Sequence, residues 1–448
     1  MTQRGHLKAP ANWINDPNGF IYFKGQYHLF YQHFPYEPRW GTMHWGHAVS
    51  RDLVNWEHKG IVLFPSKYGD QNGCFSGSAL EHEGRLYLYY TGVHYHRPDP
   101  EDIHSCLDDA FESCQMMIAS EDGMRFDNRN GKHVVIPPVL EKQIGDVTHT
   151  RDPKVWRGRD AWYMVLGSRD MAGVGSLLFY KSKNLTDWSY LNRIAGPKGF
   201  GWMWECPDYF ETEGGNVLLI SPMGFLKGRG TEENHAICML ADFDEKSGAM
   251  KLADSWQFFD YGLDLYAPQS TLDQDGRRVV IAWLRMPKPV EGGWRGMFCL
   301  PRVVEVKNGH IYFRVHPDVK RLYSKEITSV AEAREGCYRI CIELADQETL
   351  EIGGFRIRRD GDRIRTDRSK VFPGQKQFDV RFETPAVCEG NRLDIYVDPN
   401  LIEIYINDGE YVVSNAVYGL RQELCSGTTG RLKLYTFEDR KTEEFEEE

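Results

Sequence analysis

Ser50-Arg51-Asp52-Leu53-Val54-Asn55-Trp56 is the stretch that indicates the architecture, because it recurs twice along the chain. The other copies are Ser120-Glu121-Asp122-Gly123-Met124-Arg125-Phe126 and Ser182-Lys183-Asn184-Leu185-Thr186-Asp187-Trp188. Each copy follows an apolar strand signal and ends on an aromatic residue. A spacing of about 60 to 70 residues suits one four-stranded propeller blade with long loops, and roughly 300 residues at that period predict five blades.

Strand signals dominate the rest of the chain. Short runs rich in Tyr, Val, Ile and Phe, such as 26–31, 85–90, 161–166 and 217–221, are separated by turns of Gly, Asp and Asn. Long amphipathic helical patterns are scarce. The sequence therefore predicts an all-β protein.

Charge and composition exclude several classes of protein. The chain has 54 basic and 65 acidic side chains, a net charge of -11, and no run of Lys and Arg that would follow a phosphate backbone, so no nucleic acid partner is expected. No run of 18 apolar residues is present, so no membrane-spanning helix is expected. The ten cysteines have no paired spacing, and the amino terminus lacks an apolar leader. This usage indicates reduced thiols and a cytoplasmic location.

Three carboxylates stand beside prolines in tight segments. They are Trp13-Ile14-Asn15-Asp16-Pro17-Asn18-Gly19, Arg151-Asp152-Pro153 and Trp204-Glu205-Cys206-Pro207-Asp208. Any one of these segments alone is typical of an ordinary turn. Three rigidly presented acids indicate a site.

In order and spacing, the three segments resemble the acidic motifs of glycoside hydrolase family 32, the invertase and β-fructosidase family. Phe75-Ser76-Gly77-Ser78, Trp45-Gly46-His47-Ala48 and Tyr31-Gln32 extend the resemblance over about the first 300 residues. Residues 393–397 and 402–411 match more loosely. The resemblance implies a five-bladed β-propeller, in agreement with the repeat. The three acids are then expected in successive repeats, on inner strands that converge on the central axis.

The pattern changes after Pro301-Arg302. Segments 350–358, 392–397 and 401–406 alternate apolar and polar residues as sandwich strands do. With the resemblance, this predicts a propeller over 1–316, a linker over 317–335 and a C-terminal β-sandwich over 336–448. The sandwich is expected to carry no catalytic group. Its expected roles are structural support, a contact between copies in a homo-oligomer, or an accessory sugar surface.

Cleavage of a glycosidic bond needs one carboxylate beside the sugar carbon and one carboxylic acid that protonates the leaving oxygen. The resemblance assigns Asp16 as the nucleophile, forming a covalent fructosyl-enzyme, and Glu205 as the general acid/base. Asp152 is expected to bond to hydroxyls of the fructosyl unit and to stabilise the transition state. Arg151 is expected to keep the carboxylates ionised, consistent with a low pKa of Asp16. Trp202 and Trp204 are expected to line the pocket of Glu205.

Other residues are assigned to the substrate by the same resemblance. Those expected to bind it, with Tyr266 and Trp283 completing the pocket wall, are Asn15, Gln32, Trp40, Phe75, Ser76, Arg151, Tyr266 and Trp283. His94, His96, His104, Cys106 and Cys114 gather in one region, but their spacings match no usual zinc pattern. No metal and no cofactor are expected.

The predicted activity is that of a retaining β-fructofuranosidase, which hydrolyses the terminal non-reducing β-D-fructofuranosyl unit of a small sugar. Sucrose, sucrose 6-phosphate and short fructo-oligosaccharides are the candidate substrates, and a phosphate would be expected near His94, His96 and Arg97. A fructosyltransferase using the same covalent intermediate is the alternative. A sugar-binding propeller without catalysis is a remote alternative, since such a protein would be expected to lack at least one of the acids.

Overall fold

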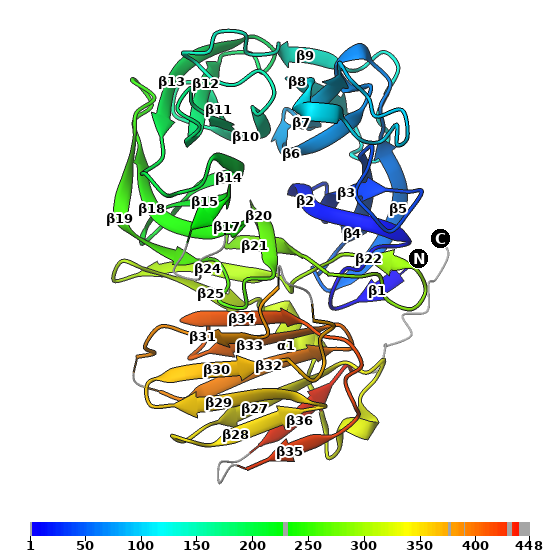
Figure 1. The fold of residues 1–448 in the computed structure, drawn as a ribbon, viewed down its shortest axis with the longest axis vertical. Coiled ribbons are helices and arrows are strands. Elements are labelled where there is room, and N and C mark those ends of the chain that lie inside the picture. The colour runs from blue at the N-terminus through cyan, green and yellow to red at the C-terminus, as the bar shows by residue number, and fades with distance from the viewer. Residues whose placement is uncertain (1, 227–231, 375–377, 389, 428–431, 439–448) are drawn as a thin grey trace. The chain divides into compact units, whose positions relative to one another are not determined.

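The computed structural model describes residues 2–226, 232–374, 378–388, 390–427 and 432–438. The chain divides into two compact units, Met1–Arg314 and Val315–Glu448. In the first unit five main sheets surround a central axis (Figure 1). This arrangement is the five-bladed β-propeller that the repeat predicts.

Each blade is built around four consecutive antiparallel strands, with the first strand nearest the axis (Figure 1). The first blade consists of β2 (Asn12–Phe23), β3 (Gln26–Phe34), β4 (His44–Ser50) and β5 (Asn55–Leu63). The second consists of β6 (Gly73–His82), β7 (Arg85–Tyr95), β8 (Phe111–Ser120) and β9 (His133–Ile136). The third consists of β10 (Arg151–Arg157), β11 (Trp162–Arg169), β12 (Gly175–Ser182) and β13 (Trp188–Ala195). The fourth consists of β14 (Met203–Thr212), β15 (Gly215–Met223), β18 (Ile237–Phe243) and β19 (Met250–Phe258). The fifth consists of β20 (Leu265–Leu272), β21 (Arg278–Leu284), β24 (Arg302–Lys307) and β25 (His310–Val315).

Short elements complete the connections. They are the 3-10 turns η1 (Tyr68–Asp70) and η2 (Leu107–Asp109) and the strand pair β16 (Phe225–Leu226) and β17 (Glu232–Glu233). Within the first blade, β1 (Thr2–Arg4) pairs with the outermost main strand, β5. The ring of blades closes between the fifth and the first. There β22 (Trp294–Arg295) runs parallel to β2, and β23 (Met297–Phe298) pairs with β21. The first and last parts of the propeller sequence are therefore joined by backbone hydrogen bonds.

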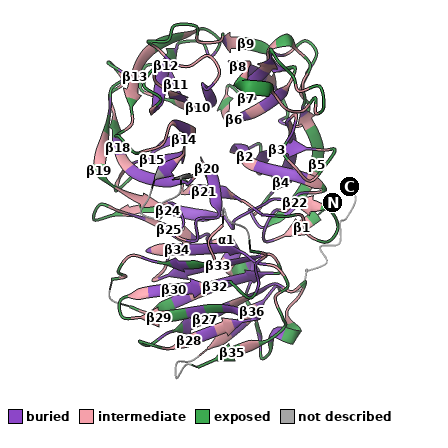
Figure 2. Cartoon of the chain, in the orientation of Figure 1, coloured by how far each residue is buried: buried purple, intermediate pink, exposed green. Residues whose placement is uncertain are grey.

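The core lies between neighbouring blades. One cluster packs Ile14 and Tyr31 of the first blade against Ile281 and Val303 of the fifth. Similar clusters join the first blade to the second, the second to the third and the third to the fourth. Figure 2 shows the strands around the axis as mostly buried, while exposed residues gather at the periphery. Each blade is thus stabilised chiefly by the apolar surface that it buries against its neighbours.

The repeated sequence forms the turn between the third and fourth strands of the first three blades. In each copy a carboxylate or amide oxygen accepts hydrogen bonds from the backbone two and three residues later, and these acceptors are Asp52, Asp122 and Asn184. The next residue has a left-handed backbone, with φ of 64° at Leu53, 71° at Gly123 and 70° at Leu185. The repeat is therefore a local turn that the chain uses three times.

The fourth and fifth blades make this connection differently, which explains why the repeat is seen only three times. Between β18 and β19 the carboxylate of Asp244 accepts from Ser247, and Gly248 closes the turn with a φ of 70°. Between β24 and β25 the tight turn is Asn308-Gly309, with both residues left-handed. The same strand connection is thus compatible with three different turn sequences.

Polar side chains of the inner strands link all five blades into a closed ring, which we call the belt. Its members are Asn18, Ser78, Lys154, Asp208 and Gln269. Asn18 accepts from Gly77 N (3.3 Å), and Ser78 Oγ donates to Pro153 O (2.7 Å). Lys154 Nζ donates to Asp208 Oδ2 (3.0 Å), which also accepts from Ser270 N (2.6 Å). Gln269 Oε1 accepts from Phe20 N (3.1 Å) and returns the ring to the first blade.

The second unit contains two sheets, as expected for a β-sandwich. One consists of β26 (Lys325–Ile327), β36 (Lys433–Thr436), β27 (Tyr338–Glu343), β32 (Arg392–Asp398), β33 (Leu401–Ile406) and β34 (Tyr411–Ala416). The other consists of β31 (Arg381–Glu383), β30 (Arg363–Asp367), β29 (Phe355–Asp360), β28 (Thr349–Ile352) and β35 (Leu424–Ser426). The helix α1 (Pro317–Leu322) and the 3-10 turn η3 (Val330–Glu332) precede β27.

Two details of the second unit differ from expectation. The segment 350–358, expected as one strand, is a hairpin of β28 and β29, because Gly353 and Gly354 turn the backbone with φ of 57° and 110°. The segment 317–335, expected as a linker, contains α1, β26 and η3, and β26 pairs with β36. This segment therefore belongs to the folded second unit.

The belt predicts a large stability effect at Asp208. The Lys154 and Asp208 side chains are 11% and 2% exposed, so replacing Asp208 with Ala leaves a buried ammonium group without its carboxylate. Breaking a buried pair in this way costs about 3–5 kcal/mol, and we expect a clear fall in the melting temperature of Asp208→Ala by calorimetry. Glu211→Ala, on the exposed part of the same strand, is the control. An unchanged melting temperature for Asp208→Ala would contradict the role of the belt.

Candidate active site

Each inner strand carries a β-bulge at the same level of the propeller. The strand register shifts between Ile14 and Pro17, Cys74 and Gly77, Arg151 and Lys154, Glu205 and Asp208, and Tyr266 and Gln269. In the last three, a residue with left-handed backbone precedes a proline, with φ of 64° at Asp152, 48° at Cys206 and 51° at Ala267. Proline is tolerated because the inner strand is the edge strand of its blade, and the bulge turns the local side chains toward the axis.

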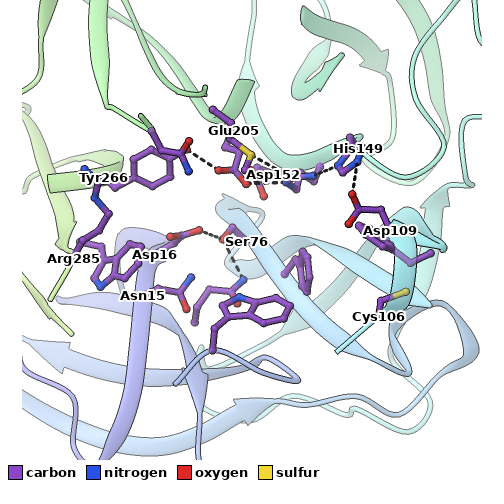
Figure 3. A pocket seen from close by; sticks show the side chains of 18 of the residues that line it. Asn15, Asp16, Ser76, Cys106, Asp109, His149, Asp152, Glu205, Tyr266 and Arg285 are labelled. Carbon is purple, nitrogen blue, oxygen red and sulfur yellow. Dashed lines mark hydrogen bonds and ion pairs between the residues drawn. The ribbon is translucent and has the colours of Figure 1, made fainter. Parts of the chain in front are cut away.

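The five bulges open into one cavity of about 690 Å³. All eleven residues that the sequence assigns to catalysis or substrate binding line it: Asn15, Asp16, Gln32, Trp40, Phe75, Ser76, Arg151, Asp152, Glu205, Tyr266 and Trp283. Figure 3 shows Asp16 facing Asp152 and Glu205 across the cavity, with Tyr266 and Arg285 along one side. The expectation that the three acids come from successive blades is wrong. Asp16 is on β2 of the first blade, Asp152 on β10 of the third and Glu205 on β14 of the fourth. The intervening blade contributes Phe75 and Ser76.

Cys206 lies between two of the acids. Its backbone N–H donates to Asp152 Oδ2 at 2.9 Å, and its Sγ is 3.5 Å from Asp152 Oδ2 and 3.5 Å from Asp16 Oδ2. Burial, followed by the nearby Asp152, raises the pKa of the Cys206 thiol well above its ordinary value. The thiol therefore stays protonated and acts as a weak hydrogen-bond donor between the carboxylates.

Asp16 is held by a short chain of hydrogen bonds. Ser76 Oγ donates to Asp16 Oδ2 at 2.5 Å, and Gln32 Nε2 donates to Ser76 Oγ at 3.1 Å. The adjacent Asn15 accepts a hydrogen bond from Trp13 Nε1 at 2.7 Å, which fixes its amide. Residues from β2, β3 and β6 thus orient one carboxylate.

Glu205 is bound on both carboxylate oxygens. Arg151 donates to Oε1 from Nε at 3.0 Å and from Nη2 at 2.8 Å, while Tyr266 donates to Oε2 at 2.7 Å. Trp202 lines the cavity, where its ring contacts His149, but Trp204 does not line it, because its ring is buried in the core between the third and fourth blades. The prediction that both tryptophans surround Glu205 is therefore wrong for Trp204.

Burial and mutual repulsion raise the pKa values of two acids. Desolvation, with repulsion from Glu205, raises the pKa of Asp16 to about 6, and Ser76 moderates this by its hydrogen bond. Desolvation, with repulsion from Glu205 and Asp16, raises the pKa of Asp152 to about 7. The expected low pKa of Asp16 is wrong, because Arg151 makes its ion pair with Glu205 and not with Asp16.

The cavity is also lined by residues that the sequence did not assign to catalysis or to substrate binding. They include Ser105, Cys106, Asp109, Phe111, His149, Met223, Asn234 and Arg285. His149 could have been noticed, since it lies two residues before Arg151. Asp109 gives no local signal, because a long connection between β7 and β8 brings it to the cavity.

The candidate phosphate residues lie elsewhere. His96 Nε2 faces Glu112 at 3.5 Å, Arg97 pairs with Asp108 at 2.5 Å, and His94 stacks on Tyr68; none of the three lines the cavity. The cavity therefore does not include these three residues, and their role toward a phosphate stays a prediction. Among the described residues, no group of three or more His, Cys, Asp or Glu side chains is arranged to hold a metal ion.

The comparisons with known proteins agree with this geometry. The model of the glycosyl hydrolases family 32 N-terminal domain matches residues 6–317, and that of the glycosyl hydrolases family 32 C-terminal domain matches residues 322–444. The chain belongs to glycoside hydrolase family 32. A sucrose-6-phosphate hydrolase of Escherichia coli is 34% identical to this family 32 enzyme over 446 residues, covering 93% of the chain and 89% of the relative. A raffinose invertase of Escherichia coli is 34% identical over 440 residues, covering 92% and 88%.

Solved structures show the same fold. A family 32 β-fructofuranosidase of Bombyx mori has a TM-score of 0.82 and 28% identity to this glycosidase, with 97% of this chain and 93% of that chain covered. A mutant of the Bombyx mori enzyme was solved in complex with sucrose. The sucrose-6-phosphate hydrolase of Lactobacillus gasseri has a TM-score of 0.84 at 24% identity, with the same coverage. The fold of this glycosidase is therefore shared with solved structures of family 32 enzymes.

Membrane helices, cysteine bonding, cellular location and oligomeric state are the remaining features that the sequence predicts. No helix in the described part of the chain is long and apolar enough to cross a membrane. The ten cysteines all lie in the described part of the chain, and none of them forms a disulfide. A cytoplasmic location and a homo-oligomer formed through the sandwich unit stay predictions from the sequence.

The raised pKa of Asp152 predicts an unusual pH dependence of stability. When the pKa of a carboxyl group is higher in the folded chain than in the unfolded chain, the group stabilises the fold fully at pH values below the pKa of the unfolded chain. This stabilisation is lost as the pH rises through the pKa of the folded chain. Asp152→Asn removes the ionisation, so we expect it to stabilise the protein by roughly 1–3 kcal/mol at about pH 8 and very little at about pH 4. Thermal unfolding at both pH values, with the exposed Asp160→Asn as control, measures this. A melting temperature below that of the wild type at the higher pH would contradict it.

Proposed function

We propose that this chain is a retaining β-fructofuranosidase that releases terminal β-D-fructofuranosyl units from sucrose, sucrose 6-phosphate or short fructo-oligosaccharides. The observation that carries the proposal is the convergence of Asp16, Asp152 and Glu205 on one cavity from three different inner strands. The relatives named as sucrose-6-phosphate hydrolases and as an invertase support the substrate class.

In the first step Asp16 attacks C2 of the fructosyl unit. The bond from C2 to the leaving oxygen breaks, and Glu205 gives its proton to that oxygen, so the leaving sugar departs as a neutral alcohol. A pKa of about 6 leaves Asp16 mostly ionised at neutral pH, as a nucleophile must be. The product of this step is a covalent ester between Asp16 and C2.

In the second step water replaces the leaving sugar. Glu205, now ionised, accepts a proton from water, the hydroxyl oxygen bonds to C2, and the ester to Asp16 breaks. Arg151 and Tyr266 hold the two oxygens of Glu205 and prevent the carboxylate from turning away. This fixed orientation suits a group that donates and then accepts a proton at one place.

The fructosyl unit is assigned to the part of the cavity around Asp16. Asn15, Gln32 and Ser76 present amide and hydroxyl groups there, and Trp40, Phe75 and Trp283 provide ring surfaces against the sugar. Asp152 lies beside Cys206 within reach of the same unit, where its charge and hydrogen bonds stabilise the positive charge that develops at C2.

The alternative activity is transfer of the fructosyl unit to a second sugar. A fructosyltransferase uses the same covalent intermediate, and only the acceptor of the second step differs. Product analysis at high sucrose separates the two, because transfer accumulates oligosaccharides while hydrolysis releases free fructose.

Removal of either principal acid is expected to abolish the activity. Asp16→Ala loses the nucleophile and Glu205→Ala loses the proton donor, so kcat for sucrose should fall by about a thousand-fold or more in each. Azide should partly restore Glu205→Ala only with an activated leaving group, since azide attacks the intermediate without a general base. Asp254→Ala, on the exposed outer strand of the fourth blade, is the control. Wild-type rates in Asp16→Ala would overturn the assignment.

The pKa of Asp16 predicts the acidic limb of the pH profile. Since kcat/KM reports the free enzyme, it should begin to fall below about pH 7 as Asp152 becomes protonated, and it should fall more steeply below about pH 6 as Asp16 becomes protonated. Ser76→Ala removes a hydrogen bond that lowers this pKa, so the limb should move upward by up to about one pH unit. Profiles of sucrose hydrolysis for wild type, Ser76→Ala and the exposed Ser189→Ala test this. An unmoved limb in Ser76→Ala would refute the coupling.

A further inference from the structure

Two side chains that the catalytic steps do not use face each other on the cavity wall. Asp109 comes from η2, between β7 and β8, and His149 comes just before β10. Figure 3 shows the carboxylate of Asp109 directed at the ring of His149. His149 Nε2 and Asp109 Oδ2 are 4.0 Å apart, and both residues line the cavity. We call Asp109 and His149 the wall pair.

Arg151 determines where the proton of His149 lies. Arg151 Nη1 is 3.2 Å from His149 Nδ1, and a guanidinium group can only donate, so Nδ1 is the acceptor. Burial, with the positive charges of Arg151 and Arg169, lowers the pKa of His149 to about 3, so the ring is neutral. The single ring proton is therefore on Nε2, the atom that faces Asp109. The wall pair presents one donor and one charged acceptor.

The separation within the wall pair leaves room for a third group. A distance of 4.0 Å is too long for a direct hydrogen bond. One hydroxyl oxygen at about 2.9 Å from Nε2 and about 2.7 Å from Oδ2 would bridge them at close to a right angle, which is acceptable geometry for a hydroxyl that accepts one bond and donates another. A sugar hydroxyl has this combination of donor and acceptor.

The backbone holds Asp109 in this position. Asp108 and Asp109 are both left-handed, with φ of 56° and 49°, and such a pair of non-glycine residues persists only where the surroundings fix it. The flanking hydrogen bonds run from Ala110 N to Leu107 O (3.1 Å) and from Leu107 N to Arg97 O (2.9 Å). Asp109 is 76% exposed toward the cavity and solvent, so its carboxylate is accessible to a ligand.

The wall pair lies on the side of the cavity where the leaving sugar departs. His149 contacts Arg151, and Arg151 binds Glu205, the group that protonates the leaving oxygen. The fructosyl contacts around Asp16 come from β2, β3 and β6. A hydroxyl that reaches His149 and Asp109 therefore belongs to the leaving sugar.

We propose that Asp109 and His149 form a subsite for a hydroxyl of an uncharged leaving sugar, and that this subsite selects sucrose over its phosphorylated form. The inference rests on the proposed β-fructofuranosidase activity and narrows its substrate class. A phosphate ester in place of the hydroxyl has no proton to donate to Asp109, and its negative charge is repelled by the carboxylate. The wall pair thus acts on specificity, and it takes no part in bond cleavage.

The test measures kcat/KM for sucrose, sucrose 6-phosphate and methyl β-D-fructofuranoside, whose leaving group has no sugar ring. The wild type should prefer sucrose to sucrose 6-phosphate. In Asp109→Asn the loss of a charged acceptor should lower kcat/KM for sucrose by about ten-fold, while the loss of repulsion offsets this for the phosphorylated sugar. The preference should therefore shrink, and the effect on the methyl fructoside should be smaller than on sucrose.

Asp108→Asn is the matched control, because Asp108 has the same backbone conformation but pairs with Arg97 and does not line the cavity. Asp108→Asn should leave kcat/KM unchanged for all three sugars. A wild type that prefers sucrose 6-phosphate, or an Asp109→Asn variant that changes all three substrates by one common factor, would overturn the inference. A wild type that releases fructose from none of the three would instead overturn the proposed activity itself.

Discussion

Closure of the ring of blades is the constraint on which the rest of the structure depends. Apolar clusters between blades supply most of the burial, but they are non-directional and do not fix how one blade is rotated against the next. The belt supplies that direction, because its hydrogen bonds join specific atoms of neighbouring inner strands. Asn18, Ser78 and Lys154 each follow a cavity residue, Asp16, Ser76 or Asp152, by two positions. The belt therefore anchors each of these inner strands directly beside its bulge, and in this way it also constrains the positions of the site residues.

The cavity concentrates negative charge at a cost in stability. Four carboxyl groups line it, those of Asp16, Asp109, Asp152 and Glu205, and the cation Arg151 is directed at Glu205. Burial, followed by repulsion between the carboxylates, raises the pKa values of Asp16 and Asp152. The protein's own cations compensate this excess of negative charge only in part. The charge suits a reaction whose transition state carries positive charge on the sugar. The arrangement is an example of a site that is unfavourable for folding and favourable for catalysis.

The sequence predicts those features that short segments determine. The Ser50–Trp56 repeat is a local turn, so it reveals the blades, and the prolines close to Asp16, Asp152 and Glu205 mark the segments that carry the site. Features set by distant partners are missed. Nothing near Asp16 shows that Arg151 is directed at Glu205, so the direction of the pKa shift of Asp16 is mispredicted. Likewise, the long connection between β7 and β8 brings Asp109 to His149, and no local sequence signal shows this. The 350–358 hairpin is predicted as one strand because its two turn glycines lie within a single alternating pattern of apolar and polar residues.

The pairing of β22 with β2 has a consequence for synthesis of the chain on the ribosome. Asn12 and Trp13 emerge early, but their partners Trp294 and Arg295 are added nearly 300 residues later. At about 5–20 residues per second the inner edge of the first blade stays open for roughly 15–60 seconds. An unpaired strand edge can associate with other chains during this interval. Pro17, at the bulge, has no backbone N–H, and it therefore limits the length of that edge with which another strand could pair.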